Sequence, residues 1–291
     1  MSKPVRTIDI GGRLTGPGEP CFVIAEIGIN HNGELPLARK LIAAAAIAGA
    51  DAVKFQKRTV ELAWRKEDLE KPRESPFGSK AEDLRRGLEF GFDEYQAIDE
   101  YCKLHGIPWF ASCWDQPSAD FVQQFEPPCW KISSASLTDD ALLLHTRSLG
   151  RPVMLSTGMS SIDQIDHAVE VLGREDLLLL HSTSVYPASL DELNLSVIST
   201  LQDRYNVPVG YSGHEVGLAT TVAAVAIGAC VVERHLTLDR ALWGSDQAAS
   251  IEPAGFARLV RDIRAVEQAV GDGRKRVYPG ELEKQHLRRF P

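Results

Sequence analysis

Two histidines of this chain of 291 residues are spaced as the ligands of a metal site would be. His214 follows the segment VPVGYSG and His235 follows CVVER, so each lies where an apolar, β-branched run meets a turn. The carboxyl ends of parallel strands face the active site in α/β barrels, and imidazole is a frequent metal ligand. We therefore predict that His214 and His235 bind one divalent metal. The alternative is that each is a buried polar residue at a strand end.

Two lysines lie inside apolar, strand-like segments. Lys54 is the central residue of AVKFQ, and Lys131 is the third residue of CWKISS. A buried ammonium is costly unless an anion pairs with it. Two such lysines among Ser and Thr hydroxyls predict a phosphate pocket. The alternative is that each lysine pairs with a core carboxylate such as Glu26 or Glu233.

The composition is that of an ordinary globular protein. The chain is 44% hydrophobic and 25% charged, and its length suits one α/β barrel of about 250 residues. A formal net charge of −8 without a basic cluster argues against a nucleic acid or an anionic membrane as partner. No apolar run approaches the ~20 residues that span a bilayer, and MSKPVRTIDI contains no signal-peptide hydrophobic region, so we expect a cytoplasmic protein.

The cysteines indicate neither a disulfide framework nor a zinc knuckle. They number five and form no CxxC pair. Cys21, Cys129 and Cys230 begin apolar runs and read as core thiols. Cys113 differs because it lies at the far end of its run.

The chain repeats one unit, in which an apolar run is followed by a polar loop and an amphipathic helix. Eight candidate strands are present, at 21–28, 52–56, 108–113, 129–134, 152–157, 177–183, 208–212 and 230–235. Helical patterns include 36–48, 94–105, 162–172 and 217–227, and Gly49, Gly106, Gly150 and Gly228 fit helix C-terminal caps. Eight units predict a (β/α)8 TIM barrel. A doubly wound sheet fits the periodicity too, but it would not naturally lack a Gly-rich dinucleotide turn.

We expect one barrel domain over residues 1–291. Residues 1–20 include a β-hairpin over the mouth or the floor of the barrel, residues 253–270 form a closing helix, and residues 271–291 form a polar tail. Residues 57–92, rich in charge and proline, form an excursion of the second loop.

Polar side chains gather at the carboxyl ends of the predicted strands, where a barrel keeps its active site. They are Glu26, Asn30 and His31; Lys54 and Gln56; Ser112, Cys113 and Asp115; Lys131, Ser133 and Ser134; Ser156 and Thr157; His181, Thr183 and Tyr186; Ser212 and His214; Glu233 and His235.

These residues carry a resemblance to a known family. The segments AEIGINHNG (25–33), DAVKFQ (51–56), WKISSA (130–135), LSTGMS (155–160), YSGHE (211–215), VERHLTLDR (232–240) and DQAASIEP (246–253) resemble the sialic acid synthase family, the phosphoenolpyruvate-dependent synthases of nonulosonic acids. The resemblance implies a (β/α)8 barrel. It also implies the condensation of phosphoenolpyruvate with the open-chain aldehyde of an N-acylated hexosamine, with release of inorganic phosphate.

The resemblance also implies roles for individual residues. A divalent metal, usually Mn²⁺ with Mg²⁺ or Co²⁺ as alternatives, would be held by His214 and His235, which with Glu26 form the catalytic set. Phosphoenolpyruvate would contact Lys54, Lys131, Ser134, Ser156 and Ser212, and the sugar would contact Asn30, Gln56, Tyr186 and Asp246. A homodimer or higher homo-oligomer is implied as well.

The sequence departs from the family pattern on the sugar side. Cys113-Trp114-Asp115, Ala135-Ser136, Ser184 and Gly213 stand where bacterial members often carry STPFS, Gly-Glu, Asn and Asp. The family also normally continues into a small antifreeze-like domain, which lends an arginine to the partner's sugar site, whereas this chain stops at LRRFP. We therefore expect N-acetylmannosamine to be a poor acceptor. The expected acceptor is another aldose, either without an N-acyl group, phosphorylated or further modified, with Trp64, Arg65, Arg73 and Arg85 of the excursion as compensating contacts.

Three functions stay open on sequence alone. The first is the metal-dependent synthase just described. The second is a metal-dependent barrel lyase or hydrolase acting on a sugar, with Cys113 as a nucleophile. The third is a barrel subunit or binding protein that needs a separate antifreeze-like chain.

Overall fold

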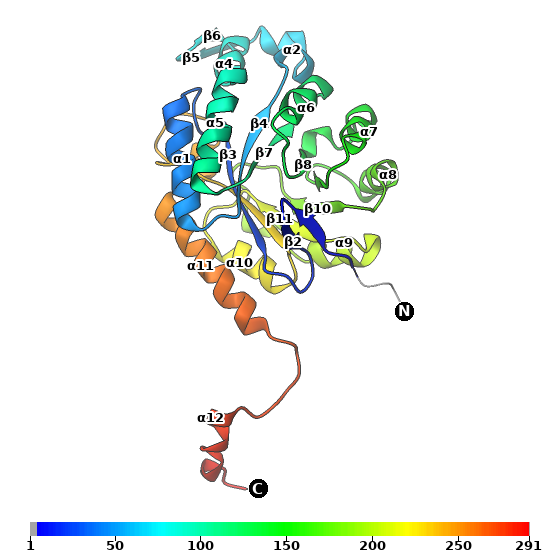
Figure 1. Ribbon diagram of the computed structural model, residues 1–291, viewed down its shortest axis with the longest axis vertical. Helices are drawn as coiled ribbons and strands as arrows, with labels where there is room; N and C mark the ends of the chain where they lie inside the picture. The colour runs from blue at the N-terminus through cyan, green and yellow to red at the C-terminus, as the bar shows by residue number, and fades with distance from the viewer. Residues whose placement is uncertain (1–4, 291) are drawn as a thin grey trace.

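Eight parallel strands close into a barrel in the computed structural model, which describes residues 5–290 (Figure 1). The strands are β3 (Phe22–Gly28), β4 (Ala52–Lys57), β7 (Trp109–Cys113), β8 (Trp130–Ile132), β9 (Val153–Ser156), β10 (Leu177–Ser182), β11 (Val209–Gly213) and β12 (Val231–His235). Each pairs with the next, and β12 pairs with β3 to close the ring. All eight predicted strands are present, and the predicted (β/α)8 fold is confirmed.

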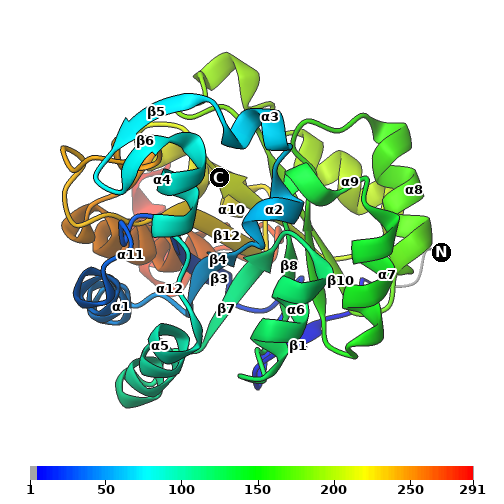
Figure 2. The same ribbon diagram turned by 90° about the horizontal axis from the view of Figure 1, so that it is seen from above.

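Helices surround this barrel on its outer face (Figure 2). They are α1 (Leu35–Ala48), α5 (Phe92–His105), α6 (Gln116–Gln123), α7 (Asp140–Ser148), α8 (Ile162–Leu172), α9 (Val197–Tyr205), α10 (Ala219–Ala226) and α11 (Pro253–Val270). Gly49 and Gly106 end α1 and α5 in the left-handed conformation, with φ of 83° and 62°. Their N–H groups donate to carbonyls of the last helical turn, which stops each helix just before the next strand.

Side-chain alternation divides the barrel wall into an inner and an outer face. On β3, Phe22 and Ile24 pack inside the barrel, whereas Val23, Ala25 and Ile27 pack against the helices. The same period of two places Glu26 inside, above Ile24. Along each strand the inward positions change from apolar at the amino end to polar at the carboxyl end. The barrel interior therefore has an apolar lower layer and a polar upper layer.

The N-terminal hairpin closes the floor of the barrel. It consists of β1 (Ile8–Ile10) and β2 (Arg13–Thr15), paired antiparallel. Ile8 and Ile10 are buried in one cluster with Phe22, Met154 and Leu178, which belong to the apolar lower layer. The sequence left the mouth and the floor open as positions, and the packing selects the floor.

The predicted excursion of the second loop lies over the carboxyl ends of the strands (Figures 1 and 2). It contains α2 (Val60–Ala63), α3 (Lys66–Leu69), the hairpin of β5 (Pro72–Ser75) and β6 (Gly78–Lys80), and α4 (Ala81–Gly87). Its first turn is fixed by the Asp115 carboxylate, which accepts hydrogen bonds from the Thr59 amide (2.7 Å) and hydroxyl (2.9 Å). Asp115 also caps α6 by accepting from the Ser118 amide.

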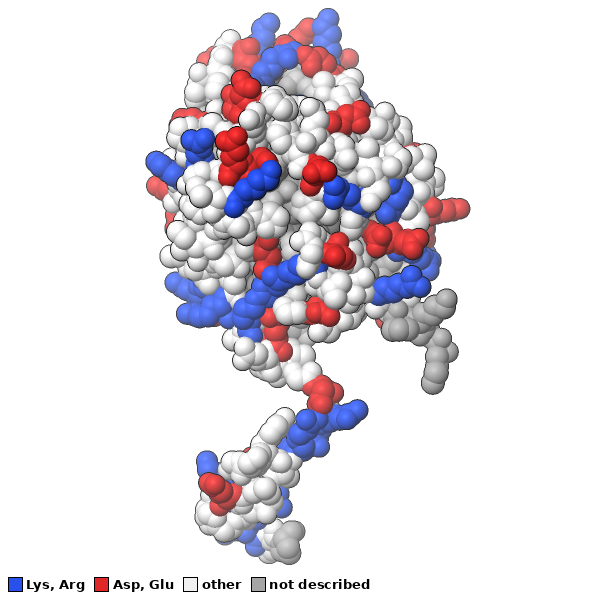
Figure 3. All heavy atoms as spheres, viewed as in Figure 1, with Lys and Arg blue, Asp and Glu red and all other residues white. Residues whose placement is uncertain are grey.

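The C-terminal tail leaves the barrel after α11 and extends away from it, with the short helix α12 (Pro279–Leu282) near its end (Figure 1). Residues 271–290 are exposed throughout. Acidic and basic side chains are interspersed over the face drawn in Figure 3. Within residues 5–290, no helix is long and apolar enough to cross a membrane.

The floor hairpin predicts a separable effect on stability. Replacing the buried Ile10 by alanine removes packing beneath the lower layer, and we expect Ile10→Ala to lower the free energy of unfolding by about 2–4 kcal/mol. Leu14→Ala is the matched control, because Leu14 of the same hairpin is 51% exposed and should change that free energy by less than about 0.5 kcal/mol. Urea denaturation followed by circular dichroism measures both. Equal losses would contradict the packing role of Ile10.

Candidate active site

A polar cavity of about 230 Å³ opens at the carboxyl end of the barrel, and every barrel strand contributes to it. Its lining from the strands consists of Glu26, Lys54, Gln56, Ser112, Lys131, Ser156, Ser182, Ser212, Glu233 and His235. The loops above add Trp114, Ser133, Ser134, Ala135, Met159, Ser184, Tyr186 and His214. Most of the predicted site residues therefore meet in one place.

A larger groove, of about 1310 Å³, lies at the opposite end of the barrel. Its lining includes Arg13, Asp51, Arg264 and Glu267, which pair with one another in salt bridges. None of the predicted site residues lines this groove. Its charged groups hold the floor hairpin to α11, so the smaller cavity is the candidate active site.

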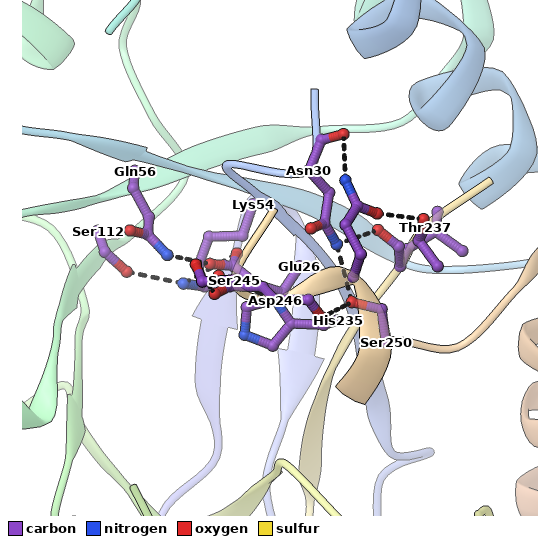
Figure 4. Close-up of polar contacts among 12 residues, drawn as sticks. Glu26, Asn30, Lys54, Gln56, Ser112, His235, Thr237, Ser245, Asp246 and Ser250 are labelled. Atoms are coloured by element: carbon purple, nitrogen blue, oxygen red, sulfur yellow. Dashed lines mark hydrogen bonds and ion pairs between the residues drawn. The ribbon is translucent and has the colours of Figure 1, made fainter. Parts of the chain in front are cut away.

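Four buried charges form the base of the cavity (Figure 4 shows Glu26 and Lys54). Lys54 Nζ lies 3.0 Å from Glu26 Oε2 and 3.7 Å from Glu233 Oε2, and it donates to Ser112 Oγ at 2.7 Å. Lys131 Nζ lies 3.9 Å from Glu233 Oε1. The pairing of each lysine with a core carboxylate is thus observed, each lysine also contacts a serine hydroxyl, and the phosphate pocket stays a prediction.

Serine hydroxyls form further hydrogen bonds with this cluster of charges. Ser156 Oγ accepts from Lys131 Nζ at 2.7 Å, and Ser212 Oγ donates to Glu233 Oε1 at 2.9 Å. Each hydroxyl can exchange its present partner for a ligand oxygen by rotating about one bond. The site therefore provides two ammonium groups and several hydroxyls to an entering anion.

The two carboxylates have opposite pKa shifts. Burial raises the pKa of Glu26, and the nearby Lys54 opposes this only in part. Burial also disfavours the charged form of Glu233, but Lys131, Lys54 and the Ser212 hydroxyl outweigh it and lower the pKa of Glu233 to about 2. Carboxyl groups whose pKa values are pushed apart can take different roles. Glu26 is thus suited to accept a proton, whereas Glu233 stays ionised and anchors both lysines.

The two lysines differ in the same way. Burial lowers the pKa of Lys131 to about 8, although Glu233 opposes the shift. Lys54 is equally buried, but Glu233 and Glu26 together raise its pKa above the ordinary value. Lys54 is therefore a permanent cation at neutral pH, whereas Lys131 titrates at the upper end of the physiological range.

Above the lysines, a serine cluster surrounds one backbone amide. The Gly158 N–H donates to Ser134 Oγ at 2.9 Å and to Ser182 Oγ at 3.1 Å. A Cβ at position 158 would lie 2.3 Å from Ser184 Oγ and 2.8 Å from Ser134 Oγ. Only glycine allows the three hydroxyls to approach this amide so closely. Converging amide and hydroxyl donors are a common way to bind phosphate oxygens.

The predicted metal ligands lie side by side at one edge of the cavity. The ring centroids of His214 and His235 are 5.6 Å apart. His214 Nδ1 donates to the Thr183 carbonyl at 2.8 Å, which leaves Nε2 as the unprotonated nitrogen of the neutral ring. Burial, reinforced by His235, lowers the pKa of His214 to about 4, so the ring is neutral at physiological pH. A neutral imidazole is the form that binds metals.

His235 also has a ring nitrogen without a hydrogen-bond partner in the described residues. Its Nδ1 is buried and finds no hydrogen-bond partner within the described part of the chain, and the nearest carboxylate oxygen recorded for it, Asp246 Oδ2, is 3.9 Å away. No group of three or more His, Cys, Asp or Glu side chains in residues 5–290 could hold a metal. Two neighbouring imidazoles are chemically suited to a divalent cation whose other positions would be filled by water and substrate, and metal binding stays a prediction.

A buried ion pair behind the histidines holds both in place. Arg234 Nη1 donates to Glu215 Oε1 at 2.9 Å, and Arg234 and Glu215 are 1% and 0% exposed. Glu215 directly follows His214, and Arg234 directly precedes His235. The Tyr211 hydroxyl also donates to Glu215, at 2.9 Å. The pair therefore ties the end of β11 to β12 and fixes the spacing of the two imidazoles.

The predicted sugar contacts divide into two groups. Gln56 and Tyr186 line the cavity: Gln56 Nε2 donates to Glu26 Oε1 at 3.0 Å, and the Tyr186 ring lies 4.1 Å from His214. Asn30 and Asp246 are not among the lining residues, and Figure 4 shows the hydrogen bond from Asn30 to Ser250. Asn30 Nδ2 donates to the Leu236 carbonyl and to Ser250 Oγ, both at 2.8 Å, and thereby ties the loop after β3 to the loop after β12. Its role as a sugar contact stays a prediction.

Two residues that the sequence placed at the site face away from it. A side chain at Gly213 would meet Glu215, Tyr211 and Arg234 behind the wall, so the prediction that this position faces the sugar is wrong. Cys113 occupies an outward position of β7 and is 3% exposed. Burial also raises the pKa of its thiol, which makes a nucleophilic thiolate unfavourable. All five cysteines are buried, so Cys113 is no exception to the core role.

Several cavity residues were not singled out from the sequence. They are Ser182 and Met159 of the lining and Gly158 behind it, whereas Ser112, Ser133 and Glu233 were placed at the strand ends without a ligand being assigned to them. Strand alternation could have predicted that Ser182 points into the barrel, since Leu178, Leu180 and Ser182 are successive inward positions. Glu233 was considered only as a structural counterion, because the sequence does not show that one carboxylate serves two lysines.

The fold and the site together define the class to which the protein belongs: a (β/α)8 barrel whose carboxyl end contains a polar cavity lined by two lysines, two carboxylates and a pair of imidazoles. Comparison with known proteins gives the family. The NeuB family matches residues 41–275, and the chain belongs to this family of sugar acid synthases. The resemblance seen in the sequence is thus confirmed.

Named relatives support the assignment. The chain is 40% identical to the human N-acetylneuraminate-9-phosphate synthase over 276 residues, which cover 93% of this chain and 77% of the relative. It is 36% identical to the N,N'-diacetyllegionaminic acid synthase of Legionella pneumophila, with 94% and 79% covered. The solved N-acetylneuraminic acid synthetase of Leptospira borgpetersenii, in complex with citrate, superposes with a TM-score of 0.88 at 32% identity, covering 99% and 98% of the two chains.

The serine cluster leads to a prediction for Gly158. In Gly158→Ala the new Cβ would lie within 2.9 Å of the Oγ atoms of Ser184, Ser134 and Ser182. At least one of these hydroxyls must therefore move. If these hydroxyls bind phosphate, the loss of one such bond should weaken phosphoenolpyruvate binding by about 10- to 150-fold in calorimetric titration. Gly280→Ala serves as the control, because no atom lies within 4 Å of its Cβ. Unchanged affinity in a folded Gly158→Ala protein would remove the serine cluster from the phosphate site.

Proposed function

We propose that this protein condenses phosphoenolpyruvate with the open-chain aldehyde of an aldose or N-acylhexosamine. The products are a 3-deoxy-2-keto sugar acid and inorganic phosphate. The observation that carries the proposal is the convergence of Lys54, Lys131 and the serine hydroxyls on one cavity that also contains Glu26 and two histidines. Relatives named as synthases of sialic and legionaminic acids support it.

In this proposal the anion pocket binds phosphoenolpyruvate. Lys54 and Lys131 neutralise its phosphate and carboxylate, while Ser134, Ser156 and Ser212 supply hydroxyl donors. The same contacts stabilise the phosphate that leaves when the C–O bond breaks. Ser182 and Ser184, which share the Gly158 amide environment, are added to the predicted set.

Glu26 and Gln56 face the reacting carbons. The enol carbon of phosphoenolpyruvate attacks the aldehyde carbon, a water molecule adds to the former enol C2, and phosphate departs, so that one water is consumed for each phosphate released. The raised pKa of Glu26 supports it as the group that takes the proton of that water. Gln56, which donates to Glu26, orients the carboxylate.

The metal belongs to the proposal because of the charge and the donor atoms of the site. Lys54 and Lys131 are already balanced by Glu26 and Glu233, so an entering multiply charged anion would leave the pocket with an excess of negative charge. A divalent cation on His214 and His235 would offset that excess and, when bound, would polarise the aldehyde oxygen. Two imidazoles completed by oxygen ligands suit Mn²⁺ or Co²⁺ better than Mg²⁺, which prefers oxygen alone.

The alternatives have less support. A lyase or hydrolase that uses Cys113 as a nucleophile conflicts with the outward, buried position of that thiol. A requirement for a separate antifreeze-like chain, like the homo-oligomer implied by the resemblance, stays a prediction. Neither alternative accounts for two lysines on the cavity floor.

Phosphate release tests the proposal directly. We expect release only when phosphoenolpyruvate, an acceptor sugar and Mn²⁺ are all present, and loss of activity on chelation. His214→Ala and His235→Ala should each abolish turnover and weaken Mn²⁺ binding in equilibrium dialysis, with an unchanged circular dichroism spectrum. His167→Ala is the control, because His167 of α8 is exposed and pairs with Asp140 of α7. Normal turnover in the double variant His214→Ala/His235→Ala would refute the metal assignment.

The pKa of Lys131 predicts how binding depends on pH. Burial lowers this pKa to about 8, and only the ammonium form pairs with an anion, so affinity should be full below that pH and lost above it. We expect the dissociation constant of phosphoenolpyruvate to rise up to about tenfold per pH unit above pH 8. Lys131→Met should bind weakly without this dependence, whereas Lys103→Met, an exposed lysine paired with Asp99, should retain it. A flat profile in the wild type would assign anion binding to Lys54 alone.

A further inference from the structure

The two lysines of the cavity floor are held in different ways. Lys54 Nζ lies 3.0 Å from Glu26 Oε2 and 3.7 Å from Glu233 Oε2. Lys131 Nζ forms one hydrogen bond in the part of the chain that the structure describes, to Ser156 Oγ at 2.7 Å. The nearest carboxylate oxygen recorded for Lys131 is Glu233 Oε1, 3.9 Å away. Lys131 is therefore the less constrained of two amines that are equally buried.

The surroundings of Lys131 favour a neutral amine. Met154, its register partner on β9, and Cys129, two residues before it, both belong to the apolar lower layer of the barrel. This burial lowers the pKa of Lys131, and the positive charge of Lys54 acts in the same direction. A lysine that is desolvated and lies beside a second cation is the kind that attacks carbonyl carbons.

The cavity can accept a small acid beside this amine. Lys131 lines the cavity, whose volume is about 230 Å³. A cavity of roughly 150 Å³ already holds benzene, which has as many non-hydrogen atoms as pyruvate. Lys54 and Ser212 line the same cavity and provide a cation and a hydroxyl for a carboxylate. The amine and the carboxylate partners therefore share one compartment.

Lys57 shows that burial alone does not create such a site. Burial lowers the pKa of Lys57 as well. Its Nζ, however, donates to the Phe90 carbonyl at 2.7 Å and lies 4.7 Å from the centre of the Phe121 ring. Phe121 belongs to α6, outside the barrel wall, and Lys57 is not among the lining residues. Of these two lysines, only Lys131 combines a lowered pKa with access to the cavity.

We propose that Lys131 forms a reversible imine with 2-oxo acids, the class of compound to which pyruvate belongs. The carboxylate of the acid contacts Lys54 and Ser212, which brings its C2 carbonyl carbon to the Lys131 amine. The inference does not depend on the synthase reaction, although the product of that reaction would contain the same 2-oxo acid group. Such acids would compete with phosphoenolpyruvate for the same two lysines.

The step balances in atoms and charge. The neutral amine attacks C2, so that a C–N bond forms and the carbonyl π electrons move to oxygen. One proton passes from nitrogen to this oxygen, and Ser156, whose Oγ lies 2.7 Å from Nζ, can relay it. The new hydroxyl takes a proton from solvent and leaves as water, while the nitrogen lone pair forms the C=N bond. One amine, one 2-oxo acid and one proton give one iminium ion and one water.

Reductive trapping with pyruvate tests the proposal. The protein is incubated with pyruvate and cyanoborohydride, which reduces the iminium ion to a stable secondary amine, and peptide mass spectrometry locates the modified lysine. We expect Lys131 to be labelled at least about tenfold faster than the enclosed Lys57 or the exposed Lys103. Acetone, which has the ketone but no carboxylate, should label Lys131 about tenfold more slowly than pyruvate does.

The pH dependence identifies the reacting amine. Burial lowers the pKa of Lys131 to about 8, whereas Asp99 raises that of Lys103. Only the neutral amine reacts, so raising the pH increases the labelling of both lysines equally until Lys131 is fully neutral. The ratio of Lys131 to Lys103 labelling should therefore be constant below pH 8 and fall up to about tenfold per pH unit above it.

Two variants serve as controls. Lys131→Arg keeps the positive charge but has no amine, and it should lose the label with an unchanged circular dichroism spectrum. Lys103→Met should leave the labelling of Lys131 unchanged, because Lys103 is exposed and pairs with Asp99 far from the cavity.

The outcomes separate this inference from the proposed function. A label absent from Lys131, a label spread over the lysines according to their exposure, or equal labelling by acetone and pyruvate would overturn the imine site. Trapping needs no phosphoenolpyruvate, acceptor sugar or metal. Its failure would therefore leave the synthase proposal intact, and a protein that released no phosphate could still be labelled at Lys131.

Discussion

The mutual neutralisation of four buried charges is the constraint on which the rest of this structure depends. Lys54 and Lys131 project into the barrel with Glu26 and Glu233, and none of the four is more than 5% exposed. One uncompensated charge at this depth would cost several kcal/mol, so each charge requires the others at close range. Glu233 is central because it is shared by both lysines. The four charges therefore balance one another, and in our proposal the lysines exchange carboxylate partners for substrate oxygens.

Along the barrel axis, the residues that stabilise the fold lie in a different layer from those that line the candidate active site. The lower layer of Phe22, Ile24, Phe110 and Met154 is apolar and is sealed by the floor hairpin, whereas the polar layer lies above it. Because successive inward residues on a strand belong to successive layers, one strand contributes to both. Outside the wall, the Arg234–Glu215 pair fixes the spacing of the two histidines without entering the cavity. The functional side chains are thus held by groups that never contact a substrate.

In our proposal, the loops above the polar layer determine which acceptor sugar is chosen. The barrel strands supply groups that suit any phosphoenolpyruvate-dependent synthase of this family. In contrast, Trp64 and Arg85 come from the excursion after β4, and Trp114 comes from the loop after β7. The relatives named above are synthases of different sugar acids, as their names state. This division is consistent with chemistry at the strand ends and acceptor choice in the loops.

The sequence by itself determined the eight strands, their order along the chain and most of the residues that line the cavity. These follow from local patterns, because apolar runs, helix-capping glycines and a period of two depend on residues near in the chain. The paired histidines and the two strand lysines were visible for the same reason. What the sequence could not decide was the floor position of the hairpin, the sharing of Glu233, the outward direction of Cys113 and Gly213, and the bridging role of Asn30. Each of these depends on contacts between segments far apart in the chain, so only the closed barrel, which brings those segments together, could settle them.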